Sequence, residues 1–463
     1  MNDRLRDYYA SLRGKKVFFL GAGVSHRQLI ETFCAKGARV TLCDKKDLQA
    51  LGDYGKKLEA LGACFHLGED YLRGLEQAEI IFRTPGIDYT KPEIQAAVAA
   101  GVTVTSEIET FFELCPAKLV GVTGSDGKTT TTTLIAEFLK AAGYTVHLGG
   151  NIGAPLLPRI EEVEPEHVAV VELSSFQLIS MKKSPDVAVV TNMAPNHLDH
   201  HRDMQEYIDA KRNILLYQKP GDIAVLNAEN DITRGMAPDV RGELRWFSRC
   251  NAVQNGAYMD AEKNLIRVRN GEETVVMNLR GIKLRGEHNK ENVTTAAAAV
   301  MGWIDDAVIR AVASAFPGVE HRIEFVREKD GVQWYNDSIG TSPTRTIAGL
   351  RSFEQKLILI AGGYDKKISY APLAPELLAH VKRLYLCGPT AQSIKREVEA
   401  LPAYGDSGLH MALAAALPAA VRSAAAAARA GDGGLLSPAS ASFDAYPNFE
   451  ARGNHFKELV KEL

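Results

Sequence analysis

The sequence predicts an α/β protein of three domains, in which mainly parallel sheets are covered by helices. The chain has 463 residues, which corresponds to about three domains of ordinary size. Hydrophobic residues make up 46% of it, enough to give each domain a core. Short apolar runs alternate with helical patterns, as in proteins whose neighbouring strands are connected through helices.

Charge and composition exclude several classes of protein. The formal net charge is −3 and the isoelectric point is near 6.5, so no strongly basic surface indicates nucleic acid or anionic lipid. The first residues lack the apolar core of a signal peptide, and no uncharged apolar run is long enough to span a membrane. The six cysteines show no metal-binding spacing and are interpreted as buried thiols of a reducing compartment. We therefore expect a cytoplasmic protein with no nucleic-acid partner and no membrane insertion.

Residues 1–113 are expected to form a Rossmann-like domain. The strands KKVFFL and ARVTLCD flank the turn GAGVS and a helix that ends near Lys36, and AEIIF and VTVT are further strands. The glycine turn, with Asp44 about 20 residues further on, half-matches a dinucleotide-binding fingerprint. His26 stands where the fingerprint has its third glycine, so the indication of a nicotinamide cofactor is weak.

Residues 114–318 are expected to form a central domain of the P-loop ATPase type. The strands are KLVGVT, VAVVEL, VAVVTN and DIAVLN, followed by a polar, hairpin-like region around residues 257–279. The first strand leads into GSDGKT, a phosphate loop with contracted glycine spacing, and a helix begins just after Lys128. The helix start attracts an anion, Lys128 would reach the β- and γ-phosphates, and the Thr129 hydroxyl suits Mg²⁺. A glycine-rich turn with an exposed lysine is the alternative, but strand, loop and helix agree on a phosphate loop.

Polar side chains follow two later strands of this domain. Glu172 closes VAVVEL, and His197 and Asp199 come shortly after VAVVTN. The carboxyl ends of neighbouring parallel strands face one crevice, so these side chains should meet near the phosphate loop. A carboxylate and an imidazole there would suit metal ions that bridge ATP phosphates. A hydrogen-bonded loop histidine is the alternative for His197 by itself.

Residues 319–463 are expected to form a second Rossmann-like domain. Its α/β series begins near Ile323 and has the strands KLILIAGG, RLYLCG and GLLSP before a terminal helix. The alanine-rich stretch 412–430 is interpreted as a helix.

Seven segments occur in a distinctive order along the chain: VTGSDGKTTTTT, VELSSFQL, NMAPNHLDHH with YIDAKRNIL, GEHNKENVTTA, HRIE, NDSIGTSPTRT and LLSPASASFDAYPNFEARGNHF. Together they resemble the Mur ligases, ATP-dependent enzymes that add amino acids to the peptidoglycan precursor. The contracted phosphate loop is the normal form in that family. ELSSFQL and SFDAYPNFEARG are similar to the members that join D-glutamate to UDP-N-acetylmuramoyl-L-alanine. The resemblance implies these two small molecules as substrates, ATP and two Mg²⁺ ions as cofactors, and a monomeric enzyme.

The resemblance also implies which residues hold ATP and its metal ions. The nucleotide would contact Gly124, Ser125, Asp126, Gly127, Lys128, Thr129, Thr130, Asn292, Arg322 and Asp337. The Mg²⁺ ligands would be Thr129, Glu172, His197 and Lys211. Lys211 would act as a carbamate formed with CO₂, which turns its cation into an anion; an ordinary surface lysine is the alternative. The catalytic residues would be Lys128, His197 and Lys211.

The substrate residues are implied in the same way. The uridine diphosphate would lie on Val24, Ser25, Asp44, Lys45, Thr84, Pro85 and Gly86, and Asn151 would lie near the γ-phosphate. The glutamate would be held by Thr341, Lys366, Ser442, Phe443 and Phe449. Ile339 stands where many members have a lysine, so Lys366 is expected to carry more of the carboxylate recognition.

Two alternatives remain. A sister ligase or a folate-polyglutamylating relative would share the central domain, but the C-terminal motifs favour D-glutamate as the acceptor. A nucleotide-binding regulator or an NAD-dependent protein would have no ligase activity. The presence of Lys128, Glu172, His197 and Lys211 argues against this second alternative.

Overall fold

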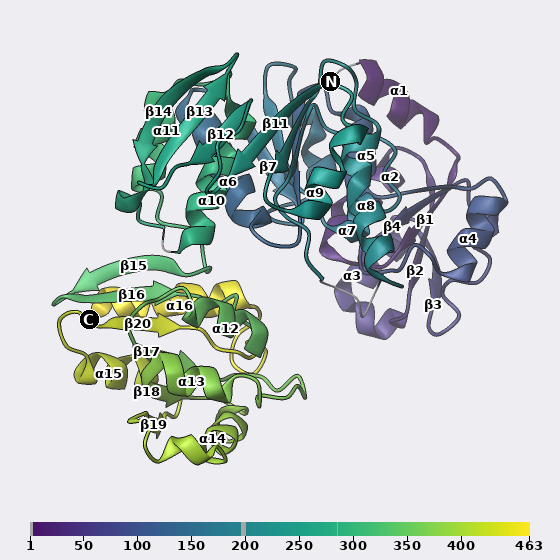
Figure 1. The fold of residues 1–463 in the computed structure, drawn as a ribbon. Helices are drawn as coiled ribbons and strands as arrows, with labels where there is room; N and C mark the ends of the chain where they lie inside the picture. The colour runs from purple at the N-terminus through teal and green to yellow at the C-terminus, as the bar shows by residue number, and fades with distance from the viewer. Residues whose placement is uncertain (1–2, 196–200, 285) are drawn as a thin grey trace. The chain divides into compact units, whose positions relative to one another are not determined.

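The computed structural model of the protein describes residues 3–195, 201–284 and 286–463 and contains three β-sheets (Figure 1). Each sheet is mainly parallel and has helices between its strands, which confirms the predicted α/β class. Among the described residues, no helix is both long enough and apolar enough to cross a membrane.

The chain divides into two compact units. The first consists of residues 1–281 and 290–313 and holds two of the sheets, and the second consists of residues 282–289 and 314–463 and holds the third.

The first sheet has five parallel strands in the order β3-β2-β1-β4-β5, as in a Rossmann fold without its sixth strand. The strands are β1 Lys16–Leu20, β2 Arg39–Asp44, β3 Cys64–Leu67, β4 Ile80–Arg83 and β5 Thr103–Thr105. The helices are α1 Asp3–Ser11, α2 Val24–Ala35, α3 Leu48–Ala60, η1 Leu75–Gln77, α4 Pro92–Ala99 and α5 Glu107–Leu114. Because β1 pairs with β2 on one side and β4 on the other, its carboxyl end lies at the edge where such sheets bind ligands.

Alternate side chains of β1 face opposite sides of this sheet, as the two-residue repeat of a strand requires. Val17 and Phe19 belong to the core that includes α1, α2 and α5, whereas Phe18 and Leu20 pack with η1 and α4. The first of these cores continues into the second sheet through side chains of β6 and β8, so the two sheets share one apolar core.

The second sheet has nine strands in the order β14-β13-β12-β11-β10-β9-β6-β8-β7. The strands are β6 Lys118–Thr123, β7 Val146–Gly150, β8 Val168–Glu172, β9 Val187–Val190, β10 Ile223–Asn227, β11 Glu243–Ser248, β12 Gly256–Met259, β13 Asn264–Arg269 and β14 Glu272–Asn278. The helices are α6 Lys128–Ala141, η2 Leu157–Glu162, α7 Ser175–Leu178, α8 Met204–Leu216, α9 Asp231–Gly235, η3 Ala237–Asp239, η4 Leu279–Gly281, α10 Glu287–Val300 and α11 Asp306–Ala315. The predicted hairpin region is confirmed, since β12, β13 and β14 pair antiparallel at one edge.

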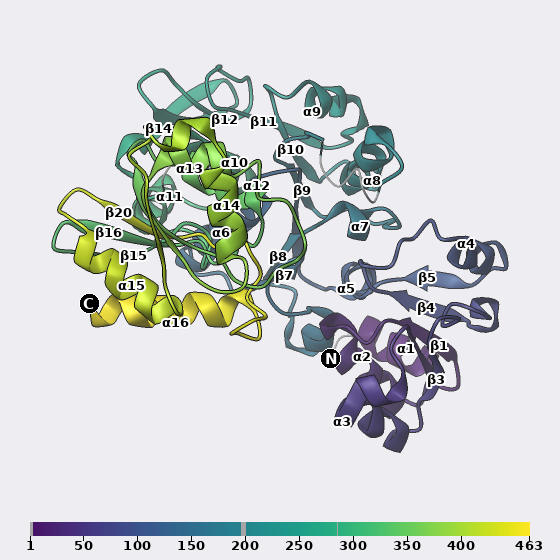
Figure 2. The same ribbon diagram turned by 90° about the horizontal axis from the view of Figure 1, so that it is seen from below.

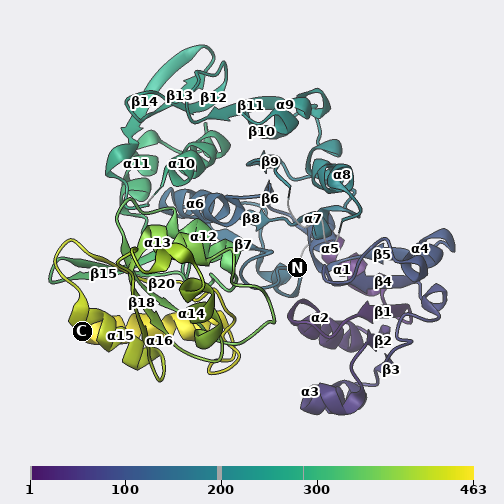
Figure 3. The ribbon, with the colours of Figure 1, turned by 60° about the horizontal axis from the view of Figure 1, so that its bottom comes forward.

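The candidate active-site residues lie where the order of successive strands in this sheet reverses. β6 lies between β8 and β9, and the chain leaves β6 toward β7 but leaves β9 toward β10. Figure 3 shows α6 beside β6 and β8. The carboxyl ends of β6 and β9 therefore flank a topological switch point, the usual ligand crevice of open α/β sheets.

The third sheet has six strands in the order β15-β16-β20-β17-β18-β19, parallel except for β15. The strands are β15 Glu324–Lys329, β16 Val332–Asn336, β17 Leu357–Ala361, β18 Val381–Leu386, β19 His410–Leu413 and β20 Gly433–Leu436. The helices are α12 Pro343–Leu350, α13 Ala374–His380, α14 Ala391–Glu399, η5 Pro402–Tyr404, α15 Leu417–Ala427 and α16 Phe449–Glu462. One face packs with α12, α13 and α14, and the other with α15 and α16, which lie side by side (Figure 2).

Two expectations were wrong in part. The alanine-rich stretch does not form a single helix, because its first residues close the edge strand β19 before α15 begins at Leu417. The cysteines are all free, but only Cys43 and Cys115 are buried, whereas Cys64 and Cys250 are exposed. Cysteine spacing alone does not report burial.

Candidate active site

The phosphate loop is packed against the carboxyl end of β9. Gly124 has a φ of +140°, and a Cβ atom on it would stand 1.9 Å from Oγ1 of Thr191. The same Thr191 hydroxyl donates to the backbone oxygen of Asp126 at 2.6 Å. Only glycine fits at residue 124, so the first glycine of the contracted loop is a requirement of packing.

Ser125 and Asp126 attach the loop to the segment after β9. The Ser125 backbone N–H donates to the oxygen of Asn192 at 2.9 Å, and the Ser125 hydroxyl donates to the oxygen of Ala194 at 2.9 Å. The Asp126 N–H donates to Oδ1 of Asn192 at 2.9 Å. The Ser125 hydroxyl also lies 3.0 Å from the hydroxyl of Tyr207 on α8. The loop is therefore held in shape by both β9 and α8.

Lys128 is the first residue of α6, which confirms the predicted strand, loop and helix. Its Nζ donates to the backbone oxygens of Gly124 at 3.0 Å and Ser125 at 2.9 Å. The ammonium is thus held against the loop, beside the positively polarised helix start that suits a phosphate.

The run of threonines after Lys128 is explained by burial and hydrogen bonds. Thr130, Thr131 and Thr132 are buried. The Thr132 hydroxyl donates to the oxygen of Lys128 at 2.7 Å, and that of Thr133 donates to Thr129 at 2.8 Å. These bonds to carbonyls four residues back satisfy two hydroxyls where the helix packs, and burial of the threonine side chains offsets their low helix propensity.

Asn292 of α10 lies against the same loop. Its Oδ1 accepts a hydrogen bond from the Thr131 hydroxyl at 3.3 Å. The structure therefore brings this predicted nucleotide residue to the first turn of α6.

Glu172 ends β8, directly beside β6, and has a buried carboxylate of which one oxygen has no partner within the described ranges. The side chain is 1% exposed, and Oε1 accepts from Nδ2 of Asn151 at 2.8 Å. Oε2 is buried and has no hydrogen-bond partner among the described residues. A buried carboxylate oxygen is costly to leave unpaired, and it is the type of ligand that Mg²⁺ prefers.

Lys211 lies on α8 and is buried, which excludes the surface-lysine alternative. It is 2% exposed, and Nζ donates to Oγ1 of Thr123 at 3.1 Å. Burial lowers the pKa of the Lys211 amine well below its ordinary value, and the nearby Lys128 acts in the same direction, against Glu172. A neutral amine is the form that reacts with CO₂.

His197 and Asp199 lie outside the residues that the structure describes. Within the described ranges, no three histidine, cysteine or acidic side chains form a cluster that could hold a metal. A Mg²⁺ ion at Glu172 would therefore need phosphate or water oxygens as further ligands, as is usual for this ion.

The residues predicted for the uridine diphosphate gather at the carboxyl edge of the first sheet. Oδ2 of Asp44 accepts from the N–H of Ala22 at 2.7 Å, so the carboxylate supports the glycine turn. A Cβ atom on Gly21 would lie 3.3 Å from Oγ1 of Thr84, at the end of β4. The others lie beside these residues: Val24 and Ser25 in the first turn of α2, Lys45 after β2, and Pro85 and Gly86 after β4.

His26 is a core residue beneath the glycine turn. It is fully buried, and Nδ1 lies 2.9 Å from the oxygen of Gly21, so Nδ1 carries the proton and donates. Burial lowers the pKa of His26 to about 4, which keeps the imidazole neutral.

The residues predicted for glutamate lie in the second unit. Nζ of Lys366 donates to the oxygen of Thr341 at 3.3 Å and lies 3.5 Å from its hydroxyl. Burial lowers the pKa of Lys366, and the cations Arg345 and Arg452 lower it further. Ile339 adds no charge here, whereas Arg345 and Arg452 both act electrostatically on Lys366.

The remaining acceptor residues follow β20 and differ in exposure. Ser442 is buried, and Phe449 begins α16. Phe443 is 64% exposed, with its ring centroid 6.0 Å from that of Tyr364.

Asp337 and Arg322, predicted for the nucleotide, are neighbours in the second unit. Oδ2 of Asp337 accepts from the Ser437 hydroxyl at 2.6 Å, and Oδ1 accepts from the N–H of Ile323 at 3.3 Å. Burial raises the pKa of Asp337 to about 7, while Ser437 and Arg322 oppose the rise.

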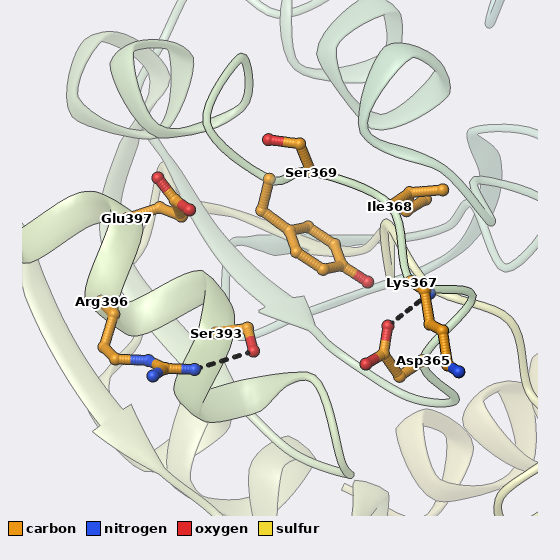
Figure 4. Close-up of a pocket in the computed structure, with 8 residues that line it drawn as sticks. Asp365, Lys367, Ile368, Ser369, Ser393, Arg396 and Glu397 are labelled. Atoms are coloured by element: carbon orange, nitrogen blue, oxygen red, sulfur yellow. Dashed lines mark hydrogen bonds between the residues drawn. The ribbon is translucent and has the colours of Figure 1, made fainter.

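A polar cavity of about 210 Å³ lies beside the loop that carries Lys366 (Figure 4). Its lining residues are Asp365, Lys367, Ile368, Ser369 and Tyr370 with Ser393, Arg396 and Glu397 of α14. Oδ1 of Asp365 accepts from the N–H of Lys367 at 2.7 Å, at a backbone φ of +57° for Lys367. No residue predicted for the glutamate is among those that line this cavity.

Sequence reasoning missed several residues that shape these sites. Thr191 and Asn192 could have been found as polar residues directly after a parallel strand, and Tyr207 as a residue one helical turn before Lys211. No local signal identifies Arg83, which is 2% exposed and donates to the oxygens of Ile87 and Phe176, both at 2.7 Å. Arg83 therefore links the turn after β4 to α7, the helix that follows β8 of the second sheet.

A phosphate loop at a topological switch point, with a buried carboxylate and a buried lysine beside it, defines a nucleotide-binding protein of the P-loop type. The chain belongs to the Mur ligase family. Residues 122–300 match the Mur ligase middle domain, residues 321–440 the Mur ligase glutamate ligase domain, and residues 15–106 the MurD-like N-terminal domain.

Curated relatives are similar over the full length. The chain is 50% identical to a UDP-N-acetylmuramoylalanine--D-glutamate ligase of Acetivibrio thermocellus, covering 100% of both chains. It is 46% identical to the protein of the same name from Clostridium botulinum (strain 657 / Type Ba4), covering 98% of each.

Solved structures share the fold at low identity. UDP-N-acetylmuramate-alanine ligase MurC from Thermotoga maritima has a TM-score of 0.57 at 17% identity, covering 97% of this chain and 99% of that one. MurF from Acinetobacter baumannii has a TM-score of 0.57 at 15% identity, covering 100% of this chain and 92% of that one.

Proposed function

We propose that the chain is an ATP-dependent ligase that joins D-glutamate to UDP-N-acetylmuramoyl-L-alanine, a step of peptidoglycan synthesis. The observation that carries this conclusion is the 50% identity, over the whole chain, to a ligase of that name. The phosphate loop, held between β6, β9 and α8, is consistent with ATP as the energy source. A sister ligase or a folate-polyglutamylating relative is not favoured.

The proposed ATP residues are the loop 124–130 with Asn292, Arg322 and Asp337. Lys128 would turn from its contacts with the loop oxygens toward the β- and γ-phosphates, while the N–H groups at the start of α6 face the same anion. A cation and aligned N–H groups stabilise charge on a phosphoryl group during its transfer.

The residues present fit Mg²⁺, since Glu172 has a buried carboxylate oxygen without a partner in the described chain. Glu172, Thr129, His197 and carbamylated Lys211 would hold two ions. Bound Mg²⁺ supplies positive charge that stabilises the phosphate oxygens. The support for a carbamate is the buried position of the Lys211 amine, which favours its neutral form.

The chemistry needs no covalent bond to the protein. The carboxylate of the L-alanine residue attacks the γ-phosphorus of ATP, and ADP leaves, which gives an acyl phosphate. The glutamate amine then attacks the acyl carbon, and phosphate leaves from the tetrahedral adduct as the amide forms. Lys128 holds the phosphates, and Thr341, Lys366, Ser442, Phe443 and Phe449 hold the incoming glutamate.

The finer assignments are proposals too. The three domains are residues 1–113, 114–318 and 319–463, and the first binds the uridine diphosphate at Asp44 and Thr84. Asn151, which fixes Glu172, lies near the γ-phosphate. We place the enzyme in the cytoplasm as a monomer.

The test is phosphate release from ATP in the presence of UDP-N-acetylmuramoyl-L-alanine. D-glutamate should support release and amide formation, whereas L-glutamate, L-lysine, meso-diaminopimelate and glycine should support little. Preference for another amino acid would identify a sister ligase. Equal release without any acceptor would show an ATPase and not a ligase.

A further inference from the structure

Arg452, in the first turn of α16, is a buried cation whose guanidinium donates four hydrogen bonds. The residue is 4% exposed. Nε donates to the hydroxyl of Ser338 at 3.0 Å, and Nη2 donates to the backbone oxygen of the same residue at 2.9 Å. Nη1 donates to the backbone oxygens of Ser440 at 3.1 Å and Ala441 at 2.9 Å.

A third segment passes over the same guanidinium. Gly363 has a φ of +147°, and a Cβ atom on it would stand 3.1 Å from Nη1 of Arg452 and 2.3 Å from the oxygen of Ala441. The Gly363 N–H is held by the hydroxyl of Thr390 at 3.0 Å. Glycine is required here because its lack of a side chain lets the loop approach the arginine closely.

These three segments carry the proposed glutamate residues. Ser338 precedes Thr341 and Gly363 precedes Lys366 by three residues each, and Ala441 directly precedes Ser442. The segments follow β16, β17 and β20, and the last two are also bonded to each other: the Gly362 N–H donates to the oxygen of Pro438 at 2.8 Å and the Tyr364 N–H to that of Ala441 at 3.0 Å. Arg452 donates hydrogen bonds to the segments after β16 and β20, and the segment after β17 passes close to its guanidinium at Gly363.

We propose that Arg452 is a positioning residue for the acceptor amino acid, which sets the distance between Lys366, Thr341 and Ser442 and adds positive charge to their surroundings. This inference rests on the proposed function. The planar fork of arginine offers five N–H donors in a rigid arrangement, and a lysine ammonium cannot reach both Ser338 and Ala441 in the same way.

The charge of Arg452 persists at neutral pH. Burial lowers the pKa of Arg452 to about 10, and the carboxylates of Asp444 and Asp337 oppose that change. A dicarboxylic acceptor therefore approaches a segment in which Lys366 and Arg452 are both cationic.

The test is the Arg452→Lys variant, with the three Michaelis constants measured separately. The KM for D-glutamate should rise about ten- to a hundredfold, because small displacements of binding groups have effects of this size. The KM for ATP and for UDP-N-acetylmuramoyl-L-alanine should stay within about twofold of the wild type. Unchanged glutamate KM, or an equal rise of all three constants, would overturn the inference.

Arg327→Lys is the matched control, because Arg327 holds the other end of α16. Its Nη1 donates to the oxygens of Lys461 at 2.7 Å and Val460 at 3.4 Å. This variant should lower the melting temperature by less than Arg452→Lys does, because Arg327 is half-buried and makes two such bonds, and should leave the glutamate KM unchanged. A rise of the glutamate KM in both variants would mean that general loosening of the helix is responsible, which also overturns the inference.

A milder variant covers the case in which Arg452→Lys does not fold. Ser338→Ala removes the hydroxyl that accepts from Nε and donates to the oxygen of Phe449 at 2.8 Å, and should raise the glutamate KM about two- to tenfold. A folded Ser338→Ala enzyme with unchanged glutamate KM would overturn the inference. Wild-type protein that forms no amide with D-glutamate would instead contradict the proposed function.

Discussion

Oδ1 of Asn292 stands 2.4 Å from the position that a Cβ atom on Gly127 would occupy. Gly127 also has a φ of +77°, a conformation that side chains disfavour. Any larger residue at 127 must therefore displace Asn292 or unwind the start of α6.

The first prediction follows from this contact. Gly127→Ala should raise the KM for ATP at least about tenfold, because the phosphate loop loses its shape. Gly143→Ala is the control: its φ is +93°, but nothing lies within 4 Å of the added Cβ. The KM for ATP of both variants is measured by titration with ATP. An equal rise of this KM in the two variants would show that backbone strain, and not the clash with Asn292, causes the effect.

Lys128→Ala should reduce kcat by about a hundredfold or more, since it removes a cation from the phosphoryl group in the transition state. Binding of the uridine substrate, measured by calorimetry, should be unchanged. Lys140→Ala, at the far end of the same helix and paired with Glu137 at 2.8 Å, should keep full activity. Near-normal turnover of Lys128→Ala would remove the phosphate-loop assignment.

Lys211→Ala should be nearly inactive if a carbamate on Lys211 ligates the metal. Acetate or formate should restore part of the rate by replacing the lost anion in the space left by the buried side chain. The same salts should not rescue Lys128→Ala, which lacks a cation. Full activity of Lys211→Ala without added anion would reduce this residue to a structural lysine.

Lys366→Ala should raise the KM for D-glutamate by roughly 10- to 150-fold, because a charged hydrogen bond is worth about 1.5–3 kcal/mol. The KM for ATP and for the UDP-sugar should change far less. Lys367→Asn is the control, since asparagine tolerates the φ of +57° at that position. If the KM for ATP changes and the KM for D-glutamate does not, Lys366 is part of the nucleotide-binding site and not of the acceptor site.

Asp337 should make folding stability depend on pH. Its pKa is raised from 3.8 to about 7 in the folded protein. The contribution of Asp337 to folding stability is therefore fully present below pH 3.8. The contribution is lost as the pH rises toward and through about 7, because the folded state then has to release the proton. Between about pH 5 and 8, the free energy of unfolding of Asp337→Asn should fall less than that of the wild type. Parallel urea titrations at the two pH values measure the difference, and identical pH dependence would show that Asp337 is ionised throughout.

The sequence by itself determined the α/β class, most parallel strands and the phosphate loop. These features are local: an apolar run, a glycine turn and a helix start lie within about 20 consecutive residues, and their chemistry does not depend on distant segments. The same local view failed at residues 412–430, where helix propensity suggested one helix but pairing with β18 makes the first residues a strand.

Only the tertiary structure decided what surrounds each candidate residue. It placed Thr191 against Gly124, left one oxygen of Glu172 without a partner among the described residues, and buried Lys211. It also gathered three strand ends around Arg452, a residue that the sequence motif contained without any indication of its contacts. Burial and contact depend on which segments pack together across the sheet, and residues more than 60 positions apart share no local pattern from which that packing follows.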